Sequence, residues 1–476
     1  MTGKAYHRGR AVLAKLGMGK VYRALHRWVR PLLRWFYRYV AIPVCLVQGG
    51  GALCFFLWLR QCGQRRIVVP PVPAACSPHI VMLVVTVLSQ DPRVEREARV
   101  LAANGFTVTI ICPAWWRMHK GEQLQLDWGS GIHFRILPQK TSRFAHYFPY
   151  IFSFTMLRAA VREDAWAYHA HDLTTAFIGL TAAALKGVAC ICDFHEWYAE
   201  NVTYHERSQR YIPHPAFKRR LFAAFERLAL HTATAVITVS ESIGKSLMER
   251  YEVTRPVHII RNIPFIYQEG SAAAGAEYMD LHKALGIAAD TLIILYQGGL
   301  GPSRNLEPVI EAMAHVPGAV LVLRGPGHEV YGPVYQARAQ GVGASDRVYC
   351  LAPVPSARVV EEGRAGDMGL WTLLTNVGLN FYYALGNKIF EYLAANLPLL
   401  VADLPEARRL VEQYQVGLCF DPDSPASIAA AINRMVEDHG FRKACIANIP
   451  RALQALRAEQ EWDKLVALYR DLQTPH

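Results

Sequence analysis

The stretch LIILYQGGLGPSRNL, residues 292–306, places an apolar run directly before a glycine-rich turn and a second apolar stretch. Leu292–Tyr296 predicts a buried strand, and Leu306–Ala314 predicts the helix that follows it. Glycines at such a junction let backbone N–H groups approach a phosphate, and the start of the helix attracts the anion. The stretch therefore predicts an α/β domain with a phosphate-binding loop.

The same alternation continues on both sides of this loop. Two more glycine-bearing segments follow it, Arg324–Gly327 and Leu385–Lys388. Alternating strands and helices predict a parallel sheet with helices on both faces. The pattern restarts after the glycine- and alanine-rich stretch Gly270–Ala276, so we expect two doubly wound α/β domains facing a ligand cleft. The other predicted strands are Ile80–Val87, Thr107–Cys112, Ala189–Asp193, Ala235–Val239, Ala319–Leu323, Arg347–Leu351 and Leu399–Val401, and the other predicted helices are Val94–Ala103, Lys388–Ala395 and Ser427–Glu437.

A chain of 476 residues is long enough for more than one hydrophobic core, which agrees with this division. We assign residues 79–268 to the first domain and 291–450 to the second. The remaining segments are a basic and apolar extension over 1–66, linkers over 67–78 and 269–290, and a C-terminal helix over 451–476. We expect that helix to pack back on the first domain.

The excess of positive charge belongs to the extension. The net charge is +12, from 51 Lys and Arg against 39 Asp and Glu, but 13 of the basic residues and none of the acidic ones precede Asp91. The rest of the chain, with 38 basic and 39 acidic residues, is nearly neutral. A nucleic-acid-binding protein usually carries its basic residues on a folded domain, so we expect no nucleic-acid partner.

Basic residues at positions 20, 23, 27, 30, 34 and 38 recur every three or four residues, with apolar residues between them. This spacing predicts a cationic amphipathic helix of the kind that lies on an anionic membrane surface. The alternative is a solvated helix docked on the protein itself. The lack of acidic residues favours the membrane.

An uncharged run from Val40 to Leu59 is long enough for one membrane pass. Pro43 and the glycines at 49–51 lower the stability of a helix at that depth, so a re-entrant or interfacial hairpin competes with a true span. A cleaved signal peptide is disfavoured because the run begins far from Met1. We expect a protein at the cytoplasmic face of the cell membrane, either peripheral or single-pass.

Polar side chains cluster where strands of the first half end. Asp91 can cap the helix that contains Arg93. The pairs His171–Asp172 and His195–Glu196 follow in the segments YHAHD and DFHEWYAE. These two pairs could converge on a metal ion, but none of their members has the i, i+4 spacing of an HExxH site. We therefore favour hydrogen bonds to a polyhydroxylated ligand and expect no metal.

In their order along the chain, these segments resemble glycosyltransferase family four, whose members retain anomeric configuration and have the GT-B fold of two facing Rossmann-like domains. The resemblance covers about residues 79–437. It rests on DPRVEREARVLAANGFTVTIIC (91–112), YHAHD (168–172), DFHEWYAE (193–200), VITVSESIGKSL (236–247), RNIP (261–264), YQGGLGPSRNLE (296–307), RGPG (324–327) and LGNKIFEYLAANLPLLVAD (385–403).

The resemblance implies that the second domain binds a nucleotide-sugar donor, such as a UDP- or GDP-sugar, and that the first domain binds the acceptor, with no cofactor required. His195, Arg304 and Glu391 would be the catalytic residues: Arg304 would neutralise the diphosphate, Glu391 would bond the ribose and His195 would lie near the transferred sugar. The implied donor-binding residues are Gly298, Gly299, Leu300, Arg304, Asn387, Lys388 and Glu391. The implied acceptor-side residues are Asp91, Arg93, His171, Asp172 and Glu196.

Two positions depart from the family pattern. The family usually has two glutamates with seven residues between them, and here Tyr383 stands in the first position while Glu391 keeps the second. Asn305 stands where a glycine often follows the arginine. A phenol in place of a carboxylate could change the choice of donor.

These features together predict a transferase that passes a sugar to a lipid-linked or polysaccharide acceptor at the cytoplasmic membrane face. The oligomeric state stays open. One alternative is a GT-B sugar-nucleotide epimerase, which would need catalytic carboxylates in the cleft. Another is a catalytically silent GT-B scaffold of a membrane polysaccharide assembly, which Tyr383 would favour.

Overall fold

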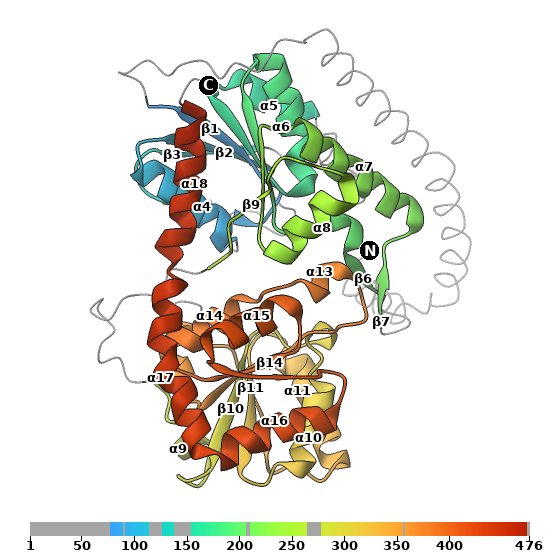
Figure 1. The fold of residues 1–476 in the computed structure, drawn as a ribbon, viewed down its shortest axis with the longest axis vertical. Coiled ribbons are helices and arrows are strands. Elements are labelled where there is room, and N and C mark those ends of the chain that lie inside the picture. The colour runs from blue at the N-terminus through green and yellow to red at the C-terminus, as the bar shows by residue number, and fades with distance from the viewer. Residues whose placement is uncertain are drawn as a thin grey trace, which may run out of the picture.

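Two parallel sheets organise the protein, one above the other in Figure 1. The structure is a computed structural model that describes residues 77–88, 91–113, 126–137, 154–205, 210–263, 278–355 and 358–473. The predicted membrane-associating extension over 1–66 and most of the predicted linkers lie outside these ranges. Within them, no helix is both long and apolar enough to span a membrane.

The first sheet has the strand order β3-β2-β1-β4-β5-β8-β9, and all of its neighbouring strands are parallel. The order reverses between β1 and β4, which is the point where doubly wound sheets bind ligands. The strands are β1 His79–Leu83, β2 Thr107–Pro113, β3 Ile132–Leu137, β4 Ala167–His171, β5 Ala189–Phe194, β8 Ala235–Thr238 and β9 His258–Ile259. The helices are α4 Pro92–Ala103, α5 Phe154–Arg162, α6 Asp172–Lys186, η4 Tyr198–Glu200, α7 Ala216–Thr232 and α8 Glu241–Tyr251.

The second sheet has the order β12-β11-β10-β13-β14-β15, again parallel throughout, and reverses between β10 and β13. Its strands are β10 Leu292–Gln297, β11 Ala319–Arg324, β12 Val348–Leu351, β13 Met368–Trp371, β14 Leu399–Ala402 and β15 Gly417–Phe420. Its helices are α9 Leu281–Leu285, η5 Pro302–Arg304, α10 Glu307–Ala312, η6 Met313–His315, α11 His328–Gly341, α12 Val359–Gly363, α13 Leu379–Tyr382, α14 Asn387–Ala394, α15 Pro405–Tyr414 and α16 Pro425–Glu437.

The predicted elements are present with small shifts at their ends. The first predicted strand extended to Val87, but β1 ends at Leu83 and the chain then turns toward α4. The helix predicted over 306–314 is divided into α10 and the 3-10 turn η6, with Leu306 as the N-terminal cap residue. The cores of both domains are built from fully buried strand residues such as Ile80 and Leu295.

The last two helices join the domains. The helix α17 (His439–Ala455) runs along the second domain, and α18 (Ala458–Gln473) continues upward along α4 of the first (Figure 1). Tyr469 of α18 packs against Phe106, with ring centroids 5.6 Å apart. Its hydroxyl lies 2.7 Å from His169 Nδ1, so α18 reaches the polar interior of the first domain.

A second contact between the domains lies near α13. The backbone N–H of Trp197 donates to the side-chain oxygen of Asn380 at 2.8 Å, and the Trp197 ring stacks on Tyr383 with an interplanar angle of 11°. Gly378 fits there because a Cβ at this position would lie 2.5 Å from the carbonyl oxygen of Glu200. The nearby strands β6 (Val202–His205) and β7 (Arg210–Pro213) form an antiparallel hairpin.

Candidate functional site

A cavity of 170 Å³ lies between the two domains, where the carboxyl ends of their sheets face each other. Four residues predicted from the sequence line it: Asp91, Arg93 and His195 from the first domain and Asn387 from the second. Its other lining residues are Pro92, Val239, Arg261, Asn262, Leu385 and Phe390.

The glycine-rich loop after β10 packs directly on the loop after β11. A Cβ on Gly325 would lie 1.9 Å from the carbonyl oxygen of Gly298, so the two backbones touch. The Gly298 amide donates to Arg324 O at 2.9 Å, and the Leu300 amide donates to Pro326 O at 2.7 Å. Of the three amides predicted to face a phosphate, only that of Gly299 lacks a hydrogen-bond acceptor within the described ranges. Gly299 therefore keeps a free donor, while its two neighbours shape the loop.

Lys388 crosses the same loop. A Cβ on Gly298, whose φ is +148°, would lie 1.9 Å from Lys388 Cε and 2.4 Å from its Nζ. The ammonium also lies 5.7 Å from the centroid of the Tyr296 ring. Burial, aided by the Arg304 guanidinium, lowers the pKa of Lys388 to about 8, and Glu391 opposes this. Arg304 and Lys388 are thus two neighbouring cations, and adding an anion between them would be favourable.

The helix α14 begins at this place. Its cap residue Gly386 has no side chain to bond the first N–H groups, and Asn387 and Lys388 form the first turn. A Cβ on Gly386 would lie 2.2 Å from Trp371 Nε1, so the start of the helix is pressed against that ring. Glu391 follows one turn later, and burial raises its pKa while Lys388 and Arg96 act in the opposite direction. Free N–H groups at a helix start suit an anionic ligand.

On the opposite wall, His195 lies between two carboxylates. Its Nε2 is 2.9 Å from Asp193 Oδ2, and its Nδ1 is 3.5 Å from Asp172 Oδ2. Its backbone N–H also donates to Asp172 Oδ1 at 3.0 Å. Asp172 has a positive φ of 62°, a conformation that a non-glycine residue adopts at some energetic cost. Burial alone would lower the pKa of His195, but the two carboxylates raise it to about 10. An acceptor at each ring nitrogen favours a proton on both nitrogens.

The other predicted acceptor-side residues take different places. Arg93 is only 2% exposed and lines the cavity with little of its surface, whereas His171 is fully buried behind His195, with its Nδ1 3.3 Å from His195 Nε2. Asp91 caps α4 by accepting from the Val94 amide at 3.3 Å. Glu196 is exposed, and its carboxylate accepts from the side chain of Asn201.

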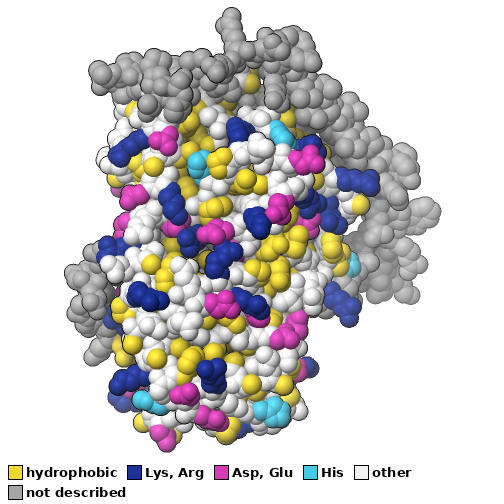
Figure 2. Space-filling model, in the orientation of Figure 1, with side chains coloured by type: hydrophobic (Ala, Val, Ile, Leu, Met, Phe, Trp, Pro, Cys, Tyr) yellow, Lys and Arg dark blue, Asp and Glu magenta, His cyan; other side chains and the backbone are white. Residues whose placement is uncertain are grey.

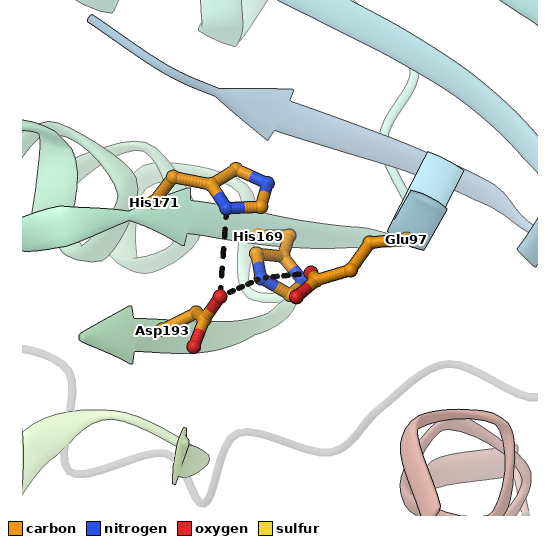
Figure 3. A group of neighbouring side chains, drawn as sticks. All are labelled: Glu97, His169, His171 and Asp193. Carbon is orange, nitrogen blue, oxygen red and sulfur yellow. Dashed lines mark ion pairs between the residues drawn. The ribbon is translucent and has the colours of Figure 1, made fainter. Parts of the chain in front are cut away.

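Behind His195, four side chains converge that could hold a cation: Glu97, His169, His171 and Asp193, with ligand atoms within 4.8 Å of one another (Figure 3). Arg93 already lies among them. It donates to both oxygens of Asp193, at 3.0 and 2.9 Å, and its Nε is 3.0 Å from Glu97 Oε1. A divalent ion here would meet a buried guanidinium, so the cluster is better described as an ion-pair network than as a metal centre.

Sequence reasoning did not select Glu97, His169 or Asp193. Two signals could have found them. Glu97 stands four residues after Arg93 in a predicted helix, the spacing of a helical ion pair. Asp193 is the last polar residue of a buried strand, two positions before His195.

Comparisons with known proteins agree with this arrangement. The family model for Glycosyltransferase Family 4 matches residues 93–263, and the model for Glycosyl transferases group 1 matches residues 278–452. The chain is a family-four-like glycosyltransferase. This confirms the family and the two-domain α/β fold predicted from the sequence.

Among relatives of this glycosyltransferase, a D-inositol 3-phosphate glycosyltransferase of Acidothermus cellulolyticus is 26% identical over 67% of the chain and 71% of the relative. An alpha-D-kanosaminyltransferase of Streptomyces kanamyceticus is 22% identical over 65% of the chain and 78% of the relative.

Solved structures share the fold of this glycosyltransferase. Sucrose-phosphate synthase of Thermosynechococcus elongatus has a TM-score of 0.63 at 17% identity, covering 83% of this chain and 99% of its own. Anabaena HepE, solved with UDP and glucose, has a TM-score of 0.59 at 15% identity, with 83% and 100% covered. WaaG, a glycosyltransferase involved in lipopolysaccharide biosynthesis, has a TM-score of 0.55 at 16% identity, with 81% and 98% covered.

Proposed function

We propose that this glycosyltransferase moves a hexose from a nucleotide-sugar donor to a lipid-linked or polysaccharide acceptor at the cytoplasmic face of the membrane, with retention of anomeric configuration. The single observation that carries the proposal is the pairing of Arg304 and Lys388 beside the free Gly299 amide. Lys388 lies against the glycine-rich loop at the start of α14, and its neighbour Asn387 lines the cavity that His195 also lines.

In this proposal the protein acts mainly through electrostatics. Breaking the bond between sugar and diphosphate leaves negative charge on the departing phosphate and positive charge on the sugar. Arg304, Lys388 and the start of α14 would stabilise the phosphate as its charge grows. The donor phosphate itself would accept the proton of the attacking hydroxyl, and Glu391 would hold the ribose. UDP is the favoured nucleotide because it occupies the related HepE structure.

The acceptor and the membrane site rest on other grounds. The concentration of positive charge before Asp91 supports an anionic membrane surface as the place of action. WaaG, which shares the fold, is involved in lipopolysaccharide biosynthesis, and this supports a membrane glycan as the acceptor. The two supports are independent, since one comes from the N-terminal sequence and the other from the body.

The test is to incubate the purified full-length protein with a panel of UDP- and GDP-sugars, with and without membrane lipid extract. A glycosylated product that forms only with lipid supports the proposal, and NMR of that product reports its anomeric configuration. Interconversion of the free donor would instead indicate an epimerase. Absence of donor binding would indicate a silent scaffold.

Two substitutions connect this activity to the site. Arg304→Ala and Glu391→Ala should each lower transfer strongly while leaving the thermal transition in place, because both side chains are only partly buried. Turnover like that of the wild type in both variants would contradict the site assignment.

A further inference from the structure

The His195 side chain is held from both ends of its ring. Asp193 lies 2.9 Å from Nε2 and Asp172 lies 3.5 Å from Nδ1. An imidazole with an acceptor at each nitrogen is most stable when both nitrogens carry a proton. Such a ring is a fixed cation that donates hydrogen bonds, and it has no lone pair with which to accept a proton.

Asp193 is itself held in one orientation. Both of its oxygens accept from Arg93, which forms a planar fork at 3.0 and 2.9 Å and also donates to the carbonyl oxygen of Ile260 at 3.0 Å. Asp193 is fully buried, which alone would raise its pKa, but Arg93 and His195 hold that pKa well below its usual range. The carboxylate therefore stays charged and aimed at His195.

The remaining titratable groups around the ring balance this charge. Burial and the Asp193 carboxylate raise the pKa of Glu97 to about 8, and burial followed by His169 lowers the pKa of His171 to about 3. Burial also lowers the pKa of His169. Burial raises the pKa of Asp172, and the His195 ring opposes that shift. The Glu97 carboxyl faces His169 Nε2 at 3.3 Å, and the Tyr469 hydroxyl faces its Nδ1.

Other charged groups face His195 from outside this set. Asp91 and Arg261 line the same cavity, and Glu196 is the next residue in the chain. Arg261 is paired with Glu461 at 3.3 Å, so its charge is largely balanced.

We propose that Arg93 and Asp193 are positioning residues of the transfer reaction: they hold His195 at the cavity wall as a doubly protonated ring facing the donor site. This role deepens the proposed function and rests on it. With a proton on each nitrogen, His195 has no lone pair with which to act as a general base. Arg93 acts only through Asp193, and Asp193 only through His195.

The test follows His195 directly, in full-length protein labelled with ¹⁵N-histidine, with His195→Gln identifying its NMR signals. In the wild type, His195 should keep both ring protons through pH 8. In Asp193→Asn, its titration should move down by at least about one pH unit, because one of the two carboxylates is lost. If His195 titrates near the ordinary histidine range in the wild type, the proposal is wrong. The wild-type protein alone therefore tests it, even if Asp193→Asn does not fold.

Kinetics provide the second measurement. Asp193→Asn should lower kcat at least about tenfold with the donor KM changed less than about threefold, and should move the alkaline limb of the pH profile to lower pH. Asp193→Glu should recover part of the rate. A loss in KM alone, or an unchanged pH profile, would mean that the network serves only folding.

Glu226→Gln is the matched control. Glu226 is another buried carboxylate of the first domain, 2% exposed, which accepts from the Ala199 amide at 2.8 Å and the Tyr251 hydroxyl at 2.5 Å. It should lower stability without moving the His195 titration. If no nucleotide sugar is turned over, the proposed function fails, while the NMR titration still decides the state of His195.

Discussion

Replacing Gly298 with alanine should displace Lys388 from the donor loop and weaken binding of UDP. A Cβ at this position would lie 1.9 Å from Lys388 Cε and 2.4 Å from Nζ. Both distances are too short for atoms that are not bonded, so the ammonium must move. A charge-assisted contact contributes about 1.5–3 kcal/mol, which corresponds to roughly a 10- to 150-fold loss of affinity. The collision is with a flexible side chain, and the φ of +148° adds about 1–2 kcal/mol of backbone strain, so the variant should still fold.

The assay is calorimetric titration with UDP at low ionic strength, after thermal melting shows that the variant is folded. Gly341→Ala is the control, because a Cβ there would meet nothing within 4 Å. A double-mutant cycle isolates the cause. If Gly298→Ala acts through Lys388, then adding it to Lys388→Ala should cause little further loss. Binding within about threefold of the wild type in Gly298→Ala, or a further large loss in the double variant, would refute this reasoning.

Three further predictions concern the donor site, the packing behind it and the extension. UDP affinity should fall as the pH rises through about 8, by up to about tenfold per pH unit, because Lys388 loses its charge there. Lys388→Arg should remove this pH dependence. An affinity of the wild type that does not change with pH would exclude Lys388 from binding. Gly386→Ala should lower the unfolding free energy by about 1–3 kcal/mol, because its Cβ would meet the buried Trp371 ring at 2.2 Å; a melting temperature equal to that of Gly341→Ala would contradict this. Deleting residues 1–66 should release a folded, UDP-binding protein into the soluble fraction, and sedimentation of the truncated protein with membranes would show that the body carries its own membrane contact.

The surface of the body agrees with the charge count. Basic and acidic side chains are intermixed over the face seen in Figure 2, without one large field of a single sign. This is what a body of 38 basic and 39 acidic residues should look like. The concentration of positive charge in the first 66 residues is therefore a feature separate from the body, and the deletion of residues 1–66 tests what it does.

Most of the strands that the sequence predicted are apolar runs that stay buried on both faces of a parallel sheet, as β10 and β11 do. The strand β12 is an exception, because three of its four residues are only partly buried. The strands β3, β4, β9, β13 and β15 were not predicted, and β4, with the sequence AYHAH, has two histidines among its five residues. Both are fully buried, and they are tolerated there only because α4 and β5 supply partners for them.

The proposed donor site could be put forward from the sequence because its parts are local. Glycine loops, a following cation and the start of a helix occur as short segments, and their positions at strand ends bring them together in any doubly wound sheet. The sequence did not separate Gly298 from Gly299, however. Gly298 makes room for Lys388, a residue that stands 90 positions further along the chain, while Gly299 keeps a free amide.

The sequence by itself determined the α/β class, the two domains, the family and the asymmetry of charge, because hydrophobic period, glycine spacing and composition are properties of neighbouring residues. Only the tertiary structure decided the state of His195. Its charge depends on Asp172 and Asp193, and Asp193 depends on Arg93, which is 100 residues away in the chain and joins it only when the first turn of α4 reaches the end of β5. Burial makes the contact between Arg93 and Asp193 strong, because no water competes for it.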